Sequence, residues 1–200
     1  MTTARRTQQQ RRHQAESALL NAAAELVVEE GVHSLTLARV GERASYSRGL
    51  VTHYFGSKQA LLQRLAHATQ AGFVPGLDGV PPGLDRLLRL IDGYIGSLAQ
   101  LRMTNRAFLL LWAEAATAPD LASIFRERDE AFRADLREDV AAGIADGTMR
   151  SDVAAAEVAV AVLAQLRGIG LQRLVDSSAV DTERLRRSVT EYWHRALALE

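Results

Sequence analysis

The 200-residue chain contains no cysteine, which excludes disulfide bonds and any metal site built from thiolates. Aromatic residues make up only 6% of the chain. The alternation of Val, Ile, Thr and Tyr that is typical of strands is also missing. Long stretches rich in Ala, Leu, Arg and Glu instead predict an all-α fold of about nine helices.

Long hydrophobic runs are absent as well. The longest, such as residues 158–164, fall far short of the roughly 20 residues that span a bilayer. The N-terminal sequence MTTARRTQQQRRHQAE is basic, but it has no apolar segment of the kind that a secretion signal requires. These absences favour a cytoplasmic protein that does not contact the membrane.

The chain has no net charge, but its charges are unevenly distributed. Residues 1–67 hold nine Arg or Lys against five Asp or Glu, whereas residues 68–200 hold fifteen against nineteen. A basic first third joined to an acidic remainder fits a protein that docks one end onto phosphate groups.

Residues 36–58, TLARVGERASYSRGLVTHYFGSK, predict two short helices joined by a tight turn. Thr36 and Ser47 are suitable N-caps, and Val51 and Phe55 are spaced to hold the second helix against the first. The outward ridge of the second helix then carries Arg48, Gly49, Leu50, Thr52 and His53. A helix-turn-helix uses this arrangement to enter the major groove of DNA.

Hydrophobic periodicity predicts the other helices. The first covers about residues 10–30, and a helix that begins after Ser57 reaches about residue 72. Residues 72–83 hold three of the four prolines and four of the fourteen glycines, which marks a linker. Later helices are expected at about residues 84–101, 104–117, 119–146, 154–176 and 181–199. We assign residues 1–62 to a DNA-binding domain and residues 63–200 to a ligand-binding and dimerisation domain.

Residues 17–65 resemble the DNA-binding domain of the TetR family of bacterial repressors (TetR/AcrR-like). The resemblance rests on the first helix and on Gly31, Thr36, the pair Arg48-Gly49, Phe55 and the run Gly56-Ser57-Lys58-x-x-Leu61. It implies a three-helix DNA-binding domain, followed by a helical regulatory domain that binds a small molecule between its middle helices. Later segments, such as IADGTMRSDV, fit the family more loosely.

Two positions depart from the family pattern. Ser45 stands in the turn where glycine is usual, which predicts a positive φ at a cost of order 1 kcal/mol. Thr52 stands where the family usually has tyrosine, and Tyr54 lies next to Phe55 instead. The usual phosphate contact of that tyrosine is therefore either lost or moved.

Candidate DNA contacts follow from the chemistry of each side chain. Arg48 can donate two hydrogen bonds to a guanine, and Gly49 lets the helix backbone approach the groove. Leu50 either touches a thymine methyl or is a partly buried core residue. Thr52 suits a base or a phosphate, and the phosphate contacts are expected from Thr36, Tyr46, Ser47, His53, Tyr54 and Lys58. Arg5, Arg6, Arg11 and Arg12 form either a DNA-binding arm or a solvated tail.

The sequence leaves room for the effector pocket that the family resemblance implies. An aromatic cavity can form from Tyr94, Met103, Phe108, Trp112, Phe125 and Phe132. Gln165 or Glu114 would supply a polar anchor, and a semi-buried carboxylate at Glu114 would favour a cationic ligand. Each of these residues also fits an ordinary core, and Glu114 can pair with an arginine instead.

The last two helices are the expected dimer surface. Their apolar stripes are Val158, Val162, Leu166 and Ile169 on one helix, and Leu185, Val189, Trp193 and Leu197 on the other. A two-fold dimer would place two recognition helices roughly 34–36 Å apart and select an inverted-repeat operator.

The favoured hypothesis is a homodimeric repressor that a small-molecule effector releases from DNA, with no enzymatic activity, cofactor or metal. An activator, or a regulator that answers to a protein partner, stays open. A more remote alternative is a helical small-molecule- or metal-binding protein without a DNA function. It rests on Glu191-x-x-His194, a spacing that di-iron bundles use together with a second such pair and two further glutamates on facing helices.

Overall fold

The structure, a computed structural model, describes residues 8–70, 74, 77 and 79–199. Within these ranges the chain forms nine α-helices and one 3-10 helix, which confirms the expected all-α fold. The helices are α1 (Gln8–Glu30), η1 (Val32–Ser34), α2 (Leu37–Ala44), α3 (Arg48–Phe55), α4 (Lys58–Gln70), α5 (Leu84–Ser97), α6 (Met103–Glu114), α7 (Pro119–Ala145), α8 (Ala155–Val175) and α9 (Thr182–Leu197).

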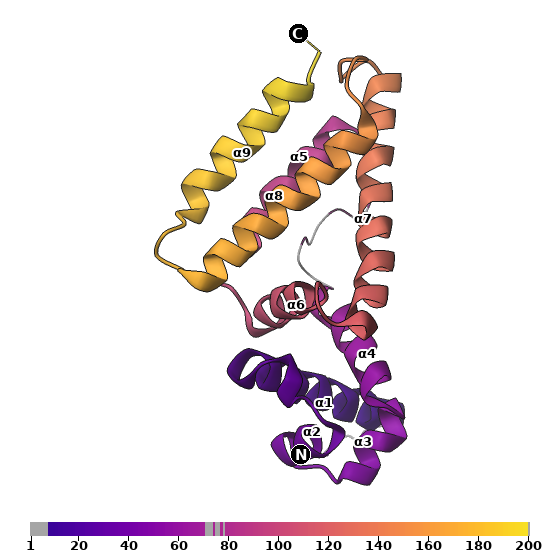
Figure 1. Ribbon diagram of the computed structural model, residues 1–200. Helices are drawn as coiled ribbons and strands as arrows, with labels where there is room; N and C mark the ends of the chain where they lie inside the picture. The colour runs from indigo at the N-terminus through magenta and orange to yellow at the C-terminus, as the bar shows by residue number, and fades with distance from the viewer. Residues whose placement is uncertain (1–7, 71–73, 75–76, 78, 200) are drawn as a thin grey trace, which may run out of the picture.

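The molecule is elongated, with α1, α2 and α3 gathered at one end (Figure 1). Helices α5, α7, α8 and α9 stand at the other end, and α6 lies across the middle above α1 (Figure 1). Helix α4 rises from the first group to the foot of α7, and it contacts α1, α6 and α7. It runs unbroken through the domain boundary that the sequence predicted between residues 62 and 63.

Side-chain caps fix the ends of the short helices. Thr36 Oγ1 accepts a hydrogen bond from the Arg39 amide (3.2 Å), and Ser47 Oγ accepts one from the Leu50 amide (3.2 Å). Ser57 Oγ accepts from the amide of Ala60 at 3.1 Å, at the start of α4. Each cap satisfies a backbone donor that the first turn of a helix leaves without an intrahelical partner. The predicted helix starts are confirmed.

The predicted apolar stripes of the last two helices face the interior of the chain. Helix α8 lies against α5, α6 and α7, and α9 lies against α5. Seven of the eight residues predicted to form the dimer surface are buried in the single chain: Val158, Val162, Leu166, Ile169, Val189, Trp193 and Leu197. The eighth, Leu185, is half-buried. In the single chain these stripes contribute to the protomer core, and their assignment to a dimer interface stays a prediction. Periodicity shows that a face is buried but not what covers it.

Candidate DNA-binding surface and regulatory cluster

Helix α3 is held by its apolar side and exposes the other. Val51 is fully buried and Phe55 nearly so, whereas Arg48, Thr52 and His53 are exposed. The ten predicted DNA contacts all reach the surface. Thr36, Ser47, Arg48, Gly49, Thr52, His53 and Lys58 are exposed, and Tyr46, Leu50 and Tyr54 are half-buried. Because Leu50 is half-buried, part of its side chain can pack against the protein while the rest reaches the surface.

The turn between α2 and α3 depends on a close backbone approach. Ser45 adopts the left-handed conformation with φ 60° and ψ 37°, as its place in the turn predicted. The Tyr46 amide donates to the Gly41 carbonyl at 2.8 Å. A Cβ on Gly41 would lie 2.7 Å from the Tyr46 carbonyl oxygen and 3.2 Å from Val51 Cγ2. Only glycine lets α2 and α3 meet this closely.

The basic start of α1 lies beside the recognition helix. A hollow of about 480 Å³ is lined by Arg11 and Arg12 of α1 and by Tyr46, Leu50, His53 and Tyr54 of the turn and α3. Both arginines are exposed there, next to four of the predicted DNA contacts. Arg5 and Arg6, the other half of the predicted arm, lie outside the described residues.

In the upper part of the molecule, most of the predicted pocket residues surround a buried arginine. The Arg167 guanidinium lies 4.5 Å from the ring centroid of Phe108, and its distances to Tyr94 and Phe132 are 5.7 and 5.8 Å. Phe125 packs edge-on against Phe108, with 5.5 Å between the ring centroids. The sequence prediction did not include Arg167. In the sequence, Arg167 stands out as the one charged residue of the apolar segment AVLAQLRGIGLQ, and this feature could have identified it.

One aromatic side chain and one acidic side chain pair directly with Arg167. Its Nη1 donates to the Tyr94 hydroxyl oxygen at 2.8 Å, and its Nη2 lies 3.4 Å from Asp129 Oδ1. Trp112 Nε1 donates to the other carboxylate oxygen of Asp129 at 2.8 Å. Burial raises the pKa of the Tyr94 hydroxyl, so the phenol stays protonated and neutral at physiological pH.

A second arginine links these residues to α4. Arg128 directly precedes Asp129 on α7, and its Nη1 contacts Nδ1 of His67. Burial, followed by the charge of Arg167, lowers the pKa of Arg128. Burial, followed by the charge of Arg128, lowers the pKa of His67. His67 is therefore held in its neutral form, in which Nδ1 can accept the hydrogen bond.

We call Tyr94, Phe108, Trp112, Phe132, Asp129, Arg128, Arg167 and His67 the Arg167 cluster. Its side-chain contacts join α4, α5, α6, α7 and α8. Three hollows among the upper helices, of about 370, 460 and 340 Å³, are lined by other residues.

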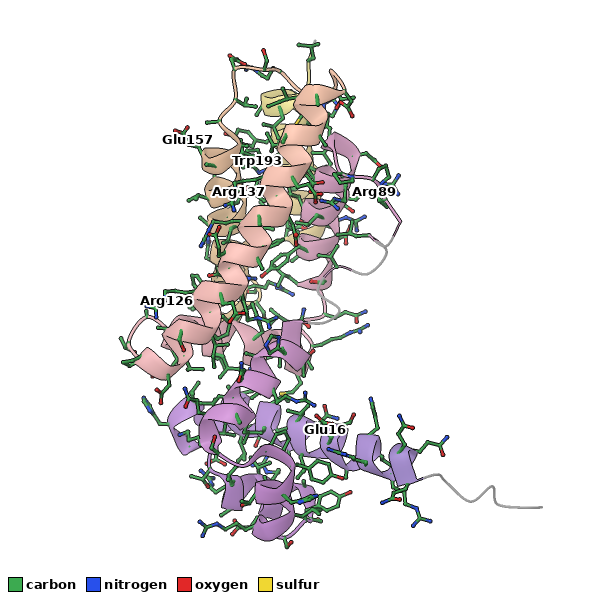
Figure 2. All side chains as sticks on the ribbon, turned by 90° about the vertical axis from the view of Figure 1, so that its right-hand side faces the viewer. Glu16, Arg89, Arg126, Arg137, Glu157 and Trp193 are labelled. Atoms are coloured by element: carbon green, nitrogen blue, oxygen red, sulfur yellow. The ribbon has the colours of Figure 1, made fainter. Side chains whose placement is uncertain are left out.

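Three predicted pocket residues lie away from this cluster. Met103 is 38% exposed at the start of α6. Glu114 Oε1 lies 3.1 Å from His33 Nε2, so its partner is a histidine of η1 rather than an arginine. Gln165 accepts a hydrogen bond from Trp193 Nε1 at 2.7 Å. Trp193 is labelled among the upper helices in Figure 2. The predicted polar anchors are thus engaged in contacts within the chain.

The residues behind the metal-binding alternative face solvent. Glu191 pairs with Arg195 at 2.9 Å along α9, and His194 is exposed. Across the described ranges, no group of three or more His, Asp or Glu side chains is arranged to hold a metal ion.

Helix α8 is unusually apolar for its position. It is the one described straight helix that is long and apolar enough to cross a membrane, with a mean hydropathy of 1.4 over its most apolar 18 residues. Only 44% of that window is buried within the chain. Core helices of globular proteins pass the same test, so length and composition alone do not make α8 a membrane span.

Comparison with known proteins matches both ends of the molecule. A family model described as "Bacterial regulatory proteins, tetR family" matches residues 19–65. A second, described as "BetI-type transcriptional repressor, C-terminal", matches residues 83–198. The HTH-type transcriptional regulator BetI 1 of Chromohalobacter salexigens is 26% identical over 185 residues, which cover 90% of this chain and 89% of that protein. BetI of Escherichia coli is 29% identical over 109 residues, which cover 52% of this chain and only 56% of that relative.

Solved structures share the architecture at low sequence identity. One from Rhodococcus sp., described as a TetR-family transcriptional regulator, has a TM-score of 0.78 at 21% identity and covers 92% of this chain and 98% of its own. A transcriptional regulator from Saccharomonospora viridis in complex with choline has a TM-score of 0.76 at 19% identity, covering 94% and 100%. At these identities the likeness establishes the fold.

Proposed function

The chain belongs to the TetR family of bacterial regulatory proteins, and from this premise we propose that it is a homodimeric repressor released from an inverted-repeat operator by a small molecule. The observation that carries the proposal is the exposed ridge of α3, which presents Arg48, Thr52 and His53 while Val51 and Phe55 anchor the helix. Family membership makes the chain a DNA-binding transcriptional regulator, and acting on the chromosome would place it in the bacterial cytoplasm.

The outer face of α8 supports a dimer. Val160 is 55% exposed, and Ala161 and Ala164 are exposed beside it. A helix that is apolar on all sides normally has protein on all sides, yet only 44% of the most apolar 18 residues of α8 is buried within the chain. Tyr192, 58% exposed on α9, adds apolar surface from the neighbouring helix. A second copy packed on these small side chains would bury both faces around a two-fold axis.

The contacts of α4 support effector control. Helix α4 leads directly from the DNA-binding end, and its His67 contacts Arg128 of the Arg167 cluster. A ligand that rearranges the cluster would therefore change how α4 is held against α7. Two DNA-reading heads whose spacing depends on α4 would then fit the operator differently. Only a ligand with different affinities for the two arrangements can drive release.

Relatives are consistent with this proposal. The matching C-terminal model is named for a repressor, and one structural neighbour was solved with choline bound. These names support a repressor with a small organic effector, without specifying the effector of this chain.

The first experiment measures binding to the DNA upstream of the protein's own gene. Fluorescence anisotropy with a labelled duplex from that region, together with sedimentation of the complex, is expected to show saturable binding of one dimer to an inverted repeat. A scrambled duplex of equal length is the control. Equal affinity for both duplexes, or a complex that contains a single subunit, would contradict the proposed function.

A further inference from the structure

The Arg167 cluster contains more hydrogen-bond donors than the chain satisfies. Arg167 is 2% exposed, and its Nε has no hydrogen-bond partner within the described part of the chain. The buried Nε of Arg128 likewise has none there. A buried donor without an acceptor costs free energy comparable to a lost hydrogen bond, and the cost is larger on a charged group. Two such atoms from neighbouring elements therefore point to an acceptor that the chain does not supply.

The Arg167 cluster also holds two arginines against one carboxylate, that of Asp129. Arg128 and Arg167 lie close enough for one charge to disfavour the other. Asp129 pairs with Arg167, and its charge and that of the exposed Glu127 both favour the charged form of Arg128. Both oxygens of Asp129 already have a partner, because one faces Arg167 and the other accepts from Trp112. Buried charges are normally paired, and an anion that reached the two unpartnered Nε atoms would complete the pairing on the buried side of both arginines.

The aromatic side of the cluster excludes a cationic occupant. Rings of Tyr94, Phe108 and Phe132 form the kind of cage that recognises a quaternary ammonium group. Here the guanidinium of Arg167 occupies that position, at 4.5 Å from the nearest ring centroid. A cationic ligand would have to displace Arg167 and remain beside Arg128, so it would meet repulsion rather than a vacant cage.

We propose that the effector is an organic carboxylate whose anionic group binds the Nε edges of Arg167 and Arg128 and whose apolar body lies against the surrounding rings. This inference rests on the proposed function, since it names the chemical class of the effector that controls the operator. It also gives the signal a route, because Arg128 drawn toward a carboxylate changes its contact with His67 of α4.

The test uses calorimetric titration of the full chain with three sodium carboxylates of increasing size, acetate, benzoate and decanoate, at constant ionic strength. Benzamide serves as the neutral match for benzoate, and choline as the cation. We expect saturable binding of at least one carboxylate and none of benzamide or choline. Because a charge-assisted hydrogen bond is lost, Arg167→Lys and Arg128→Gln are each expected to weaken it by about tenfold to hundredfold.

Arg126→Gln is the matched control, since Arg126 is exposed on α7 two residues before Arg128. It is labelled near the lower end of that helix in Figure 2. Circular dichroism melting establishes that each variant is folded, and the half-buried Arg128 provides a folded variant if the change at Arg167 does not. Binding of no carboxylate, equal binding by the Arg126 and Arg128 variants, or choline binding stronger than carboxylate binding would each overturn the proposal.

Operator binding, measured separately by anisotropy, distinguishes the two levels of the argument. Operator binding without any carboxylate site would overturn the effector class and leave the DNA function standing. A carboxylate site in a protein that binds no operator would overturn the DNA function and leave the carboxylate site standing. Operator release by the bound carboxylate, lost in Arg128→Gln and retained in Arg126→Gln, is the result that supports both.

Discussion

His67 on α4 and Arg128 on α7 are joined through Nδ1 of the imidazole and Nη1 of the guanidinium. The contact connects the helix that leaves the DNA-binding end to the longest helix of the regulatory end. It requires a neutral histidine, because a protonated imidazole has no acceptor nitrogen to offer. This contact of the junction between the two parts of the molecule therefore depends on the protonation state of one side chain.

This dependence predicts a loss of stability at acidic pH. Burial, followed by the charge of Arg128, lowers the pKa of His67 in the folded protein. Below about pH 6.5 the unfolded chain binds a proton at this residue that the folded protein resists, so the free energy of unfolding falls as pH falls. The loss ends once the folded protein also takes up the proton. Chemical denaturation at a series of pH values measures it.

His67→Asn removes the titrating group and keeps an acceptor oxygen near the position of Nδ1. We expect the stability of this variant to depend less steeply on pH than that of the parent over the range from about 7.5 to about 5.5. His13→Asn, at an exposed position on α1, is the control and is expected to follow the parent. A His67→Asn variant with the same pH dependence as the parent would show that the junction does not titrate.

Local sequence signals were sufficient to predict the DNA-binding end. The caps Thr36 and Ser47 act within their own turns, and the positive φ of Ser45 follows from its place between two helices. Each of these features depends on residues a few positions away, which a single sequence displays.

The regulatory end could be predicted only in part. The sequence indicated that aromatic residues of different helices meet, but not that Arg167 lies among them. It also showed apolar stripes on the last two helices, but not that α5, α6 and α7 of the same chain pack against them. Both outcomes are set by how helices far apart in the sequence pack, and periodicity within one helix carries no such information.

Two glycines of the DNA-binding end are expected to respond differently to the same substitution. Gly41→Ala places a methyl group 2.7 Å from the Tyr46 carbonyl oxygen, so α2 and α3 must separate. We expect a loss of stability of about 1–3 kcal/mol, measured by denaturant unfolding. Gly49→Ala meets only Ser47 Oγ at 3.9 Å, so stability is expected to stay within about 0.5 kcal/mol of the parent.

For operator binding we expect the reverse order, with the larger direct effect from Gly49→Ala and the smaller from Gly41→Ala. If the backbone of α3 lies close to the groove, the added methyl at Gly49 weakens binding by about 1–3 kcal/mol in a protein of normal stability. The Gly41 variant loses binding only in proportion to its unfolded or distorted fraction. Unchanged affinity of Gly49→Ala would place α3 farther from the DNA than proposed.

Arg48 and Lys58 are expected to contribute to operator binding in different ways. Arg48→Ala is expected to cost about 1–3 kcal/mol and to relax discrimination at one base pair, because a bidentate contact with guanine is lost. Lys58→Ala is expected to weaken binding to all sequences alike and to flatten the salt dependence by about one unit, because one phosphate contact is lost. Anisotropy titrations across operator variants and salt concentrations measure both effects. Parent-like binding by both variants at matched salt would show that the surface is wrongly assigned.

Val160→Glu tests the proposed dimer surface. Val160 is 55% exposed in the single chain, so the substitution is expected to change protomer stability by no more than about 0.5 kcal/mol. In a two-fold dimer the change would place two unpaired carboxylates in an apolar contact, so sedimentation is expected to show monomers. Met103→Glu, another exposed apolar position but on α6, is the control and is expected to remain dimeric.

The same variant links assembly to DNA binding. Two recognition helices on one dimer bind the second half-site at a high effective concentration, and separate monomers lose this advantage. Val160→Glu is therefore expected to bind a full operator only about as tightly as a single half-site, although its α3 surface is intact. A Val160→Glu protein that sediments as a dimer and binds the operator like the parent would exclude this face of α8 from the interface. The second copy would then have to cover another surface of the molecule.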